Sequence, residues 1–286
     1  MDGNPIVAVF LPVALGIVMF GLGLTLTLDD FKRVVTFPKP VIVGLVCQML
    51  VLPVVCFAIA SAFGLAPELA VGLMLLAASP GGATANLFSH LAKGDVALNV
   101  SLTAVNSVLS LITLPIIVNF AMEAFIGAGQ YIPMQASKVV QVFAIVLVPV
   151  GLGMLVRGKR PAVAERFAGS VKLLSAIVLL LVVASAVLKE RAHIGDYFQQ
   201  VGLAALAFNL ASMAVGYLVP RLLGIADRQA IAIGMEIGIH NGTLAIAIAG
   251  PTVLNNGTMA IPPAIYSLIM FFTAAAFGWF VNRRAQ

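Results

Sequence analysis

Long apolar runs separated by short polar stretches recur along the whole chain, and this pattern predicts nine membrane-spanning helices. Each run is long enough to cross the hydrocarbon core of a bilayer, which takes about 20 apolar residues in a helix. The runs cover residues 5–28, 39–63, 68–92, 96–125, 134–156, 167–189, 197–220, 228–250 and 261–282. Because the connections are short, we expect one all-α membrane domain over residues 1–286 and no separate soluble domain.

Two of these spans are interrupted near their middle by residues that break helices. The third span carries Pro80, Gly81 and Gly82, and the eighth carries Gly234 and Gly238. Non-helical backbone at this depth persists only where it is buried in protein or lines a cavity. Broken helices in corresponding positions of two halves are typical of transporters with an inverted repeat. We therefore expect two antiparallel broken helices that cross, in a repeat of five helices whose first half lacks its first helix.

Composition and charge support a membrane protein and give its orientation. The chain is 61% hydrophobic and 9% charged, with a mean hydropathy of +1.10. Basic residues collect in every second connection, which the positive-inside rule places in the cytoplasm. The main ones are Lys32, Arg33, Lys39, Lys93, Arg157, Lys159, Arg160, Arg166, Arg221, Arg228, Arg283 and Arg284. We expect an integral inner or plasma membrane protein with its amino terminus outside and its carboxyl terminus in the cytoplasm. The net charge of +5 then reflects attraction to an anionic leaflet, and it requires no nucleic acid.

Glu236 is the acidic residue that falls in the middle of a long apolar run, beside one of the predicted breaks. A lone carboxylate at this depth costs about 3 kcal/mol or more, so it needs a partner, and we expect a cation. Freed carbonyls at a helix break and neutral side-chain oxygens suit a hard cation such as sodium. Candidate oxygens belong to Gln48, Asn86, Asn99 and Thr103, and the spacing of Asn99 and Thr103 puts them on one helical face with Asn106.

Four stretches of the sequence point to a known family. Residues 20–26 read Phe-Gly-Leu-Gly-Leu-Thr-Leu, residues 79–86 read Ser-Pro-Gly-Gly-Ala-Thr-Ala-Asn, residues 91–100 read Leu-Ala-Lys-Gly-Asp-Val-Ala-Leu-Asn-Val, and residues 236–241 read Glu-Ile-Gly-Ile-His-Asn. These stretches resemble the bile acid:sodium symporter family and its bacterial homologues. The resemblance implies an inverted-repeat fold with a core domain, here about 39–125 and 197–282, and a panel domain, about 5–28 and 134–189.

The resemblance also implies two sodium sites. The first would use Asn86, Asn99, Thr103 and Glu236, although the family's serine before the asparagine is Ala85 here. The second would use Gln48, Glu236 and the backbone carbonyls of Ile237 and Ile239.

The family's substrate contacts correspond to Asn241 and to the backbone amides around Ala83 and Thr84. One departure concerns the second sodium site, because His240 stands where the family has a glutamine ligand. An imidazole is a poor ligand for a hard cation. We hypothesise that the second site is weakened, or is titrated by His240 so that coupling depends on pH between about 5 and 8. In a milder version His240 donates to the carboxylate of the substrate.

The function expected from these residues is sodium-coupled secondary active symport of an organic anion by alternating access. The anion would be bile-acid-like or a small carboxylate, and the sequence leaves open its identity, the sodium stoichiometry, the oligomeric state and the direction of transport. The expected partners are sodium, the anion and lipid, with no obligate protein partner.

Three other classes compete with this interpretation. The alternative within transport is a proton-coupled carrier or antiporter of the same fold that uses Glu236 and His240. A channel is a further alternative, which saturable uptake without conductance would exclude. An enzyme is not expected, because the aspartates fall at span ends or in loops and the chain lacks a Gly-x-Ser-x-Gly nucleophile motif.

Overall fold

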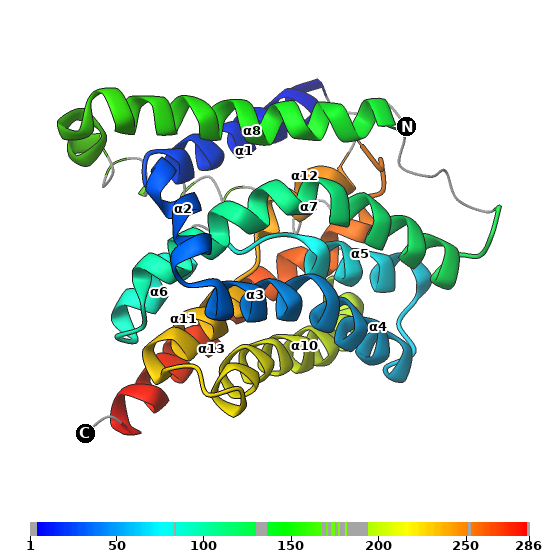
Figure 1. Cartoon of the computed structure of the whole chain (residues 1–286). Coiled ribbons are helices and arrows are strands. Elements are labelled where there is room, and N and C mark those ends of the chain that lie inside the picture. Colours follow the sequence, from blue (N-terminus) through cyan, green and yellow to red (C-terminus); the bar gives the residue numbers. More distant parts are fainter. Residues whose placement is uncertain are drawn as a thin grey trace.

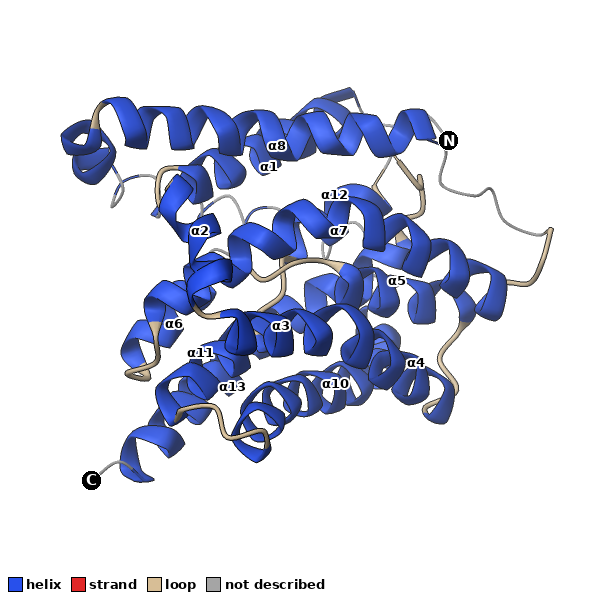
Figure 2. Cartoon of the chain, viewed as in Figure 1, coloured by secondary structure: helices blue, strands red, loops and turns tan. Residues whose placement is uncertain are grey.

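The computed structural model describes residues 5–82, 84–129, 136–167, 194–250 and 253–284, together with residues 170, 173, 174, 177 and 181. The described residues are mostly helical and contain no strand, apart from one isolated bridge between Gly81 and His240. Figure 2 shows this all-helical character, which confirms the predicted all-α class. Most of the sixth expected span, 167–189, lies outside the described residues.

The described helices lie within or near the predicted runs (Figure 1), while the number of nine spans and their inverted repeat stay predictions. Among the described residues, four continuous stretches are long and apolar enough to cross a membrane: Pro38–Ala62, Val96–Phe125, Phe198–Leu222 and Thr258–Arg283. The elements are α1 (Pro5–Gly23), α2 (Leu28–Thr36), α3 (Pro38–Val46), η1 (Cys47–Val51), α4 (Leu52–Ala62), α5 (Pro67–Ala78), α6 (Ala85–Leu91), α7 (Val96–Phe125), α8 (Ala136–Lys159), α10 (Ile194–Leu222), α11 (Asp227–Gly238), α12 (Gly242–Ala249), η2 (Thr258–Ala260) and α13 (Ile261–Arg284).

Two elements differ from the expected spans for local reasons. The first helix ends at Gly23 and not near residue 28, where a second helix, α2, begins at Leu28. Both the backbone N–H and the hydroxyl of Thr27, which precedes α2, donate to the carboxylate of Asp30 at 2.7 and 2.8 Å, as the side chain at the third helical position accepts in a capping box. The second span contains a π-helical turn, η1, just before Pro53. Proline has no N–H for the preceding turn, so the hydrogen-bond pattern widens there.

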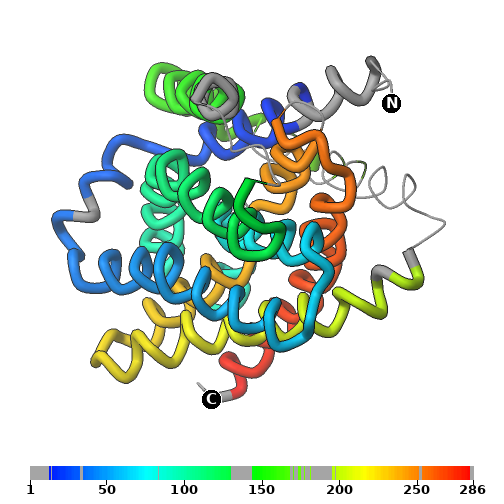
Figure 3. Tube along the Cα trace, turned by 90° about the vertical axis from the view of Figure 1, so that its right-hand side faces the viewer, coloured from blue at the N-terminus to red at the C-terminus, as the bar shows by residue number. Residues whose placement is uncertain are grey.

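Helices α1 and α8 lie side by side along one edge of the molecule, as both Figure 1 and the turned view in Figure 3 show. Two glycines permit this close approach. A Cβ atom at Gly23 would collide with the Val150 carbonyl, and one at Gly153 would collide with the Phe20 carbonyl. Small residues commonly allow such packing in membrane helices. The division into core and panel domains stays a prediction.

The two interrupted spans lie in the centre of the protein. All residues of α12, and residues 69–78 of α5 and 230–238 of α11, are buried. The longer helices α7 and α10 instead expose apolar side chains along one face, for example Ile112, Ile116 and Leu203. An exposed apolar face of this kind is suited to lipid. Consequently the breaks are surrounded by protein, as non-helical backbone in a membrane requires.

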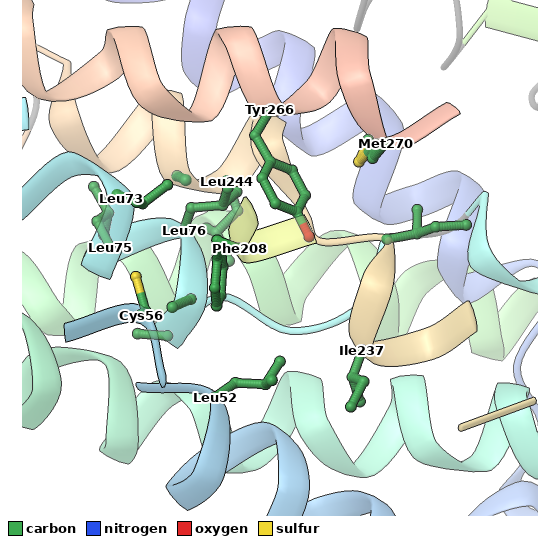
Figure 4. Packing of buried hydrophobic residues seen from close by; sticks show 14 of the residues in the cluster. Leu52, Cys56, Leu73, Leu75, Leu76, Phe208, Ile237, Leu244, Tyr266 and Met270 are labelled. Carbon is green, nitrogen blue, oxygen red and sulfur yellow. The ribbon is translucent and has the colours of Figure 1, made fainter. Parts of the chain in front are cut away.

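Aromatic side chains fill the space beside the second break. Phe208 of α10 and Tyr266 of α13 pack at 5.7 Å between ring centroids, and both are fully buried. Figure 4 shows these two rings together, with Leu76 from α5 and Leu244 from α12 close by. Residues from both interrupted spans and from two long helices therefore share one apolar core.

Candidate functional site

The two breaks meet and satisfy each other's backbone hydrogen bonds. The first lies between α5 and α6, and the second between α11 and α12. Gly81 and His240 form an antiparallel bridge, the N–H of Gly82 donates to the carbonyl of Ile239 at 2.6 Å, and the N–H of Asn241 donates to the carbonyl of Pro80 at 2.9 Å. Groups that lipid would leave unpaired are thus paired across the crossing.

Gly81 brings the first break into direct contact with Glu236 of the second. The Glu236 carboxylate lies directly against the backbone of Gly81. A Cβ atom at position 81 would overlap both carboxylate oxygens. No residue other than glycine fits here without moving Glu236. Gly81, which was predicted as a helix breaker, therefore also leaves room for the Glu236 carboxylate.

Glu236 is fully buried and has no basic partner among the described residues. Its exposed fraction is 0%, the hydroxyl of Thr103 donates to Oε2 at 2.6 Å, and Nδ2 of Asn106 lies 3.5 Å from Oε1. The three ion pairs found among the described residues involve other acids. A buried carboxylate without a countercharge is costly, so this one requires a cation or a proton.

Several amide oxygens of the residues predicted to bind sodium have no hydrogen-bond partner in the part of the chain that is described. They are Oε1 of Gln48, Oδ1 of Asn86 and Oδ1 of Asn99, and each of these atoms is buried. The amide nitrogens of two of them are anchored, Gln48 to the Ser79 carbonyl at 2.9 Å and Asn99 to the Ala232 carbonyl at 2.7 Å. Anchored nitrogens leave the oxygens as acceptors for another group. Neutral oxygens next to a carboxylate are the ligands that a hard cation such as sodium prefers.

Some of the residues predicted for the first sodium site contact one another directly, and the others lie on helices that pack together. Thr103 contacts Glu236, and its hydroxyl also lies 3.0 Å from the Asn99 carbonyl, one turn earlier on α7. Asn86 stands at the start of α6, directly after the first break. Each of these residues comes from one of three elements that pack on one another, α6, α7 and α11.

His240 occupies a tight aromatic pocket beside the predicted second site. Its ring stacks on Phe208 at 5.6 Å and meets the edge of Tyr266 at 5.4 Å. Nδ1 lies 3.4 Å from the Ser79 carbonyl and 3.5 Å from Nε2 of Gln48, while Nε2 of His240 is buried without a described partner. The histidine thus lies next to Gln48, as its place in the resemblance implies.

The carbonyls predicted for the second site have different surroundings. The Ile239 carbonyl already accepts from Gly82. Gly238 lies between Ile237 and Ile239 in the chain. Its carbonyl accepts from Nδ2 of Asn209 and from the hydroxyl of Tyr266, both at 2.9 Å. These two donors fasten the end of α11 to α10 and α13. Neither donor could be predicted from the sequence, because both contacts join distant segments.

The predicted substrate contacts lie at the starts of the two half-helices that follow the breaks. Asn241 is buried, and its side chain caps α12 by accepting from the N–H of Leu244 at 3.0 Å. Thr84 is half-buried at the start of α6. Ala83 lies outside the described residues.

Asn106 is a functional candidate that the sequence interpretation left out of its ligand set. The three-residue spacing from Thr103 already placed it on the same face of α7. Its Nδ2 approaches Glu236, and its Oδ1 is buried without a described partner.

Comparison with known proteins identifies the family. A model described as the sodium bile acid symporter family matches residues 12–196. The sodium-dependent transporter YocS of Bacillus subtilis is 30% identical over 260 residues, which cover 91% of this chain and 78% of that protein. The chain belongs to the sodium bile acid symporter family. The resemblance inferred from the sequence motifs is thereby confirmed, and the chain is an integral multi-pass membrane protein of a transporter family and not an enzyme.

Other members of the family have related names. The chloroplastic sodium/metabolite cotransporter BASS2 of rice is 28% identical over 273 residues, which cover 95% of this chain and 64% of that protein. The human ileal sodium/bile acid cotransporter is 26% identical over 282 residues, or 96% of this chain and 80% of that protein. The chain therefore spans somewhat less than two thirds of the rice relative's length. The family model ends before Glu236, but an aligned segment of 91% of this chain, as with YocS, has to include both breaks.

Proposed function

We propose that the protein is a sodium-coupled secondary active symporter that carries an organic anion across the membrane by alternating access. The observation that carries this proposal is the fully buried Glu236, which has no basic partner among the described residues and contacts Asn106, whose amide oxygen is one of several buried oxygens without a described partner. Sodium appears in the printed names of YocS and of the human ileal cotransporter, and this supports the choice of ion.

Two sodium ions would bind where the breaks meet. The first would be held by Asn86, Asn99, Thr103 and Glu236, and the second by Gln48, Glu236 and the carbonyls of Ile237 and Ile239. Sodium bound here neutralises the carboxylate and removes most of the cost of keeping it at membrane depth. It also links α6, α7 and α11, so the crossing becomes more rigid when the ions are present.

The anion would bind at the amino-terminal ends of α6 and α12, close to the sodium ions. Helix amino termini present unpaired N–H groups and positive dipole ends to an anion. The residues involved would be Ala83, Thr84 and Asn241, with His240 beside them. Because the same breaks hold sodium and position these amides, sodium binding favours anion binding, and this coupling free energy is reciprocal.

Alternating access would move the core domain, 39–125 and 197–282, against the panel domain, 5–28 and 134–189. Nine spans in an inverted repeat, with the amino terminus outside, would give the two broken helices opposite directions. Ligands that bind one of two conformations better than the other are sufficient to drive the change. The buried position of both breaks within the core is consistent with their moving as a unit.

Thermal unfolding of the purified full-length chain tests sodium coupling before a substrate is known. We expect sodium chloride to raise the unfolding midpoint relative to choline chloride at the same pH and ionic strength, since a ligand at 100 times its Kd contributes about 2.7 kcal/mol. Uptake of labelled taurocholate and labelled pantoate into proteoliposomes then tests the anion. Equal midpoints in sodium and choline, with uptake driven by a pH gradient in choline, would establish the proton-coupled alternative instead.

A further inference from the structure

Three helices meet at one place on the surface, at the end of the molecule where the carboxyl terminus lies (Figure 1): α6 and α13 end there, and α11 begins there. Nδ2 of Asn282, near the end of α13, donates to the carbonyl of Leu91, the last residue of α6, at 3.0 Å. The N–H of Asp95 donates to the carbonyl of Arg228, in the first turn of α11, at 2.8 Å. The loop between α6 and α7 is therefore fastened to both other helices.

Lys93 in this loop has a backbone conformation that usually requires glycine. Its φ is 59°. The N–H of Lys93 donates to the carbonyl of His90 at 3.0 Å, and that of Gly94 donates to the carbonyl of Ser89 at 2.8 Å. These are the two bonds of a Schellman motif, in which glycine is the usual residue at the position of Lys93. A side chain is unfavourable in this conformation, so a lysine here indicates a role for its ammonium group.

Two further cations extend from the segments that contact this loop. Arg228 accepts the hydrogen bond from the loop through its own carbonyl, and Arg283 directly follows Asn282. The side chains of Lys93, Arg228 and Arg283 are all exposed. None of them forms an ion pair with an acid in the described part of the chain, where the ion pairs use other bases.

The two acids closest to these cations in the sequence have other partners. The carboxylate of Asp95 accepts an N–H from the first turn of α7. The carboxylate of Asp227 accepts from the hydroxyl of Tyr217 at 2.9 Å and lies 3.4 Å from Nε of Arg221. The positive charge of Lys93, Arg228 and Arg283 is therefore available to an anion from outside the chain.

Apolar side chains are exposed next to the cations. Trp279 of α13 is 58% exposed, and the guanidinium carbon of Arg283 lies 4.0 Å from the centroid of its ring, which is a cation–π contact. On α6, Leu87 and Leu91 are 47% and 60% exposed. Tryptophan is typical of the depth at which lipid headgroups lie. Cations beside exposed apolar side chains match a ligand with an anionic head and an apolar tail.

We propose that Lys93, Arg228 and Arg283 bind the phosphate of an anionic phospholipid, whose acyl chains lie against the exposed apolar side chains of α6 and α13. Ammonium and guanidinium groups are common partners of phosphate, and basic pockets between membrane helices bind anionic headgroups. Because α6 follows the first break and α11 precedes the second, this lipid fastens the ends of both interrupted spans together. The site does not depend on the proposed sodium coupling.

The test is thermal unfolding of the purified full-length chain in a neutral detergent, with dioleoylphosphatidylglycerol or dioleoylphosphatidylcholine added at the same concentration. We expect phosphatidylglycerol to raise the unfolding midpoint more than phosphatidylcholine does. Lys93→Gly should be more stable than the parent in phosphatidylcholine, since glycine suits this backbone, and yet lose about half or more of the difference between the two lipids. This opposite pair of changes separates the charge of Lys93 from its place in the fold.

Arg283→Ala should lose a similar share of the difference between the lipids, whereas Lys93→Arg should keep it. Arg160→Ala is the matched control, because Arg160 is an exposed base that follows α8, and its loss should change nothing. Equal midpoints in the two lipids overturn the proposal. So does a full difference in both Lys93→Gly and Arg283→Ala, or an equal loss in Arg160→Ala, which would mean that only the overall charge matters.

Glycerol 3-phosphate distinguishes a lipid from a free phosphate. At the concentration used for the lipid it should not shift the midpoint, because it lacks the acyl chains. A shift as large as that caused by phosphatidylglycerol would overturn the assignment to a lipid. The response to sodium is measured without added lipid, so a failure of this site leaves the proposed symport untouched.

Discussion

The two breaks in this protein contribute different things to the same site. The first has six residues between α5 and α6, with Pro80, Gly81 and Gly82 and no charged side chain. The second has only three residues between α11 and α12, of which His240 is one, and Glu236 lies directly before them in the last turn of α11. The first thus supplies space and backbone amides, and the second supplies charge and side chains. At membrane depth, one segment can therefore leave the space for a charged group that the other segment supplies.

The strongest test of this difference adds a side chain to the first break. Gly81→Ala should displace the Glu236 carboxylate, because the new Cβ would overlap both of its oxygens. Overpacking alone costs about 1–3 kcal/mol, and displacement of a buried charge adds to it, so we expect a much lower unfolding midpoint and no stabilisation by sodium. Gly151→Ala is the control, since a Cβ there meets no atom within 4 Å. A Gly81→Ala protein that responds to sodium normally would contradict the contact.

Removing the charge beside the second break has the next largest effect. Glu236→Gln keeps the shape and removes a carboxylate that requires a cation or a proton, so in choline the variant should be more stable than the parent by up to about 3 kcal/mol. In sodium this order should reverse or vanish, because the cation has lost its main ligand. Unfolding midpoints in both salts measure the effect, with the exposed Glu123→Gln as control. A variant stabilised by sodium as much as the parent would show that the ion binds elsewhere.

His240→Gln tests whether the imidazole in the second break weakens sodium binding. A glutamine oxygen is a better ligand for sodium than a ring nitrogen, so the half-saturating sodium concentration should fall severalfold. The loss of stacking on Phe208 should lower stability in choline by about 0.5–1.5 kcal/mol. Sodium titrations followed by thermal unfolding report both quantities. Should the sodium dependence stay the same while stability falls, His240 is a packing residue and the second site does not depend on it.

The smallest expected effect concerns the donors that hold the end of α11. Tyr266→Phe removes one of the two hydrogen bonds to the Gly238 carbonyl, which is worth about 0.5–1.5 kcal/mol. We expect a slightly lower midpoint in both salts and a modestly weaker sodium response, because the neighbouring carbonyls become less well fixed. Tyr217→Phe, at the far end of α10, serves as a comparison for the loss of a tyrosine hydroxyl. An unchanged midpoint would mean that Asn209 alone is sufficient.

Much of this arrangement was predictable where the signal is local. Pro80 and the paired glycines marked the first break. The second break begins one residue after the predicted Gly238, whereas Gly234, the other predicted breaker, lies inside α11. The α7 helix covers the expected range 96–125, and it begins where Asp95 caps it by accepting from the N–H of Leu98 at 3.1 Å. Local capping and breaking residues are readable because their effect does not depend on distant parts of the chain.

The features that the sequence did not predict depend on contacts between distant segments. Asn209 and Tyr266 reach Gly238 from α10 and α13, and nothing in their own neighbourhoods indicates this. The π-helical turn that holds Gln48 also escaped prediction, since a run of apolar residues reads the same for either kind of helix. Asn106 was on the predicted face, but only the structure shows that its Oδ1 has no partner among the described residues.

The hydrogen bonds between the breaks also have a mechanical consequence. Gly82 is joined to Ile239 and Asn241 to Pro80, so neither segment can shift along the other without breaking both bonds at once. A displacement of one segment therefore displaces the other as well. The amide protons of Gly82 and Asn241 should accordingly exchange with deuterium together and slowly, whichever side of the membrane the site faces.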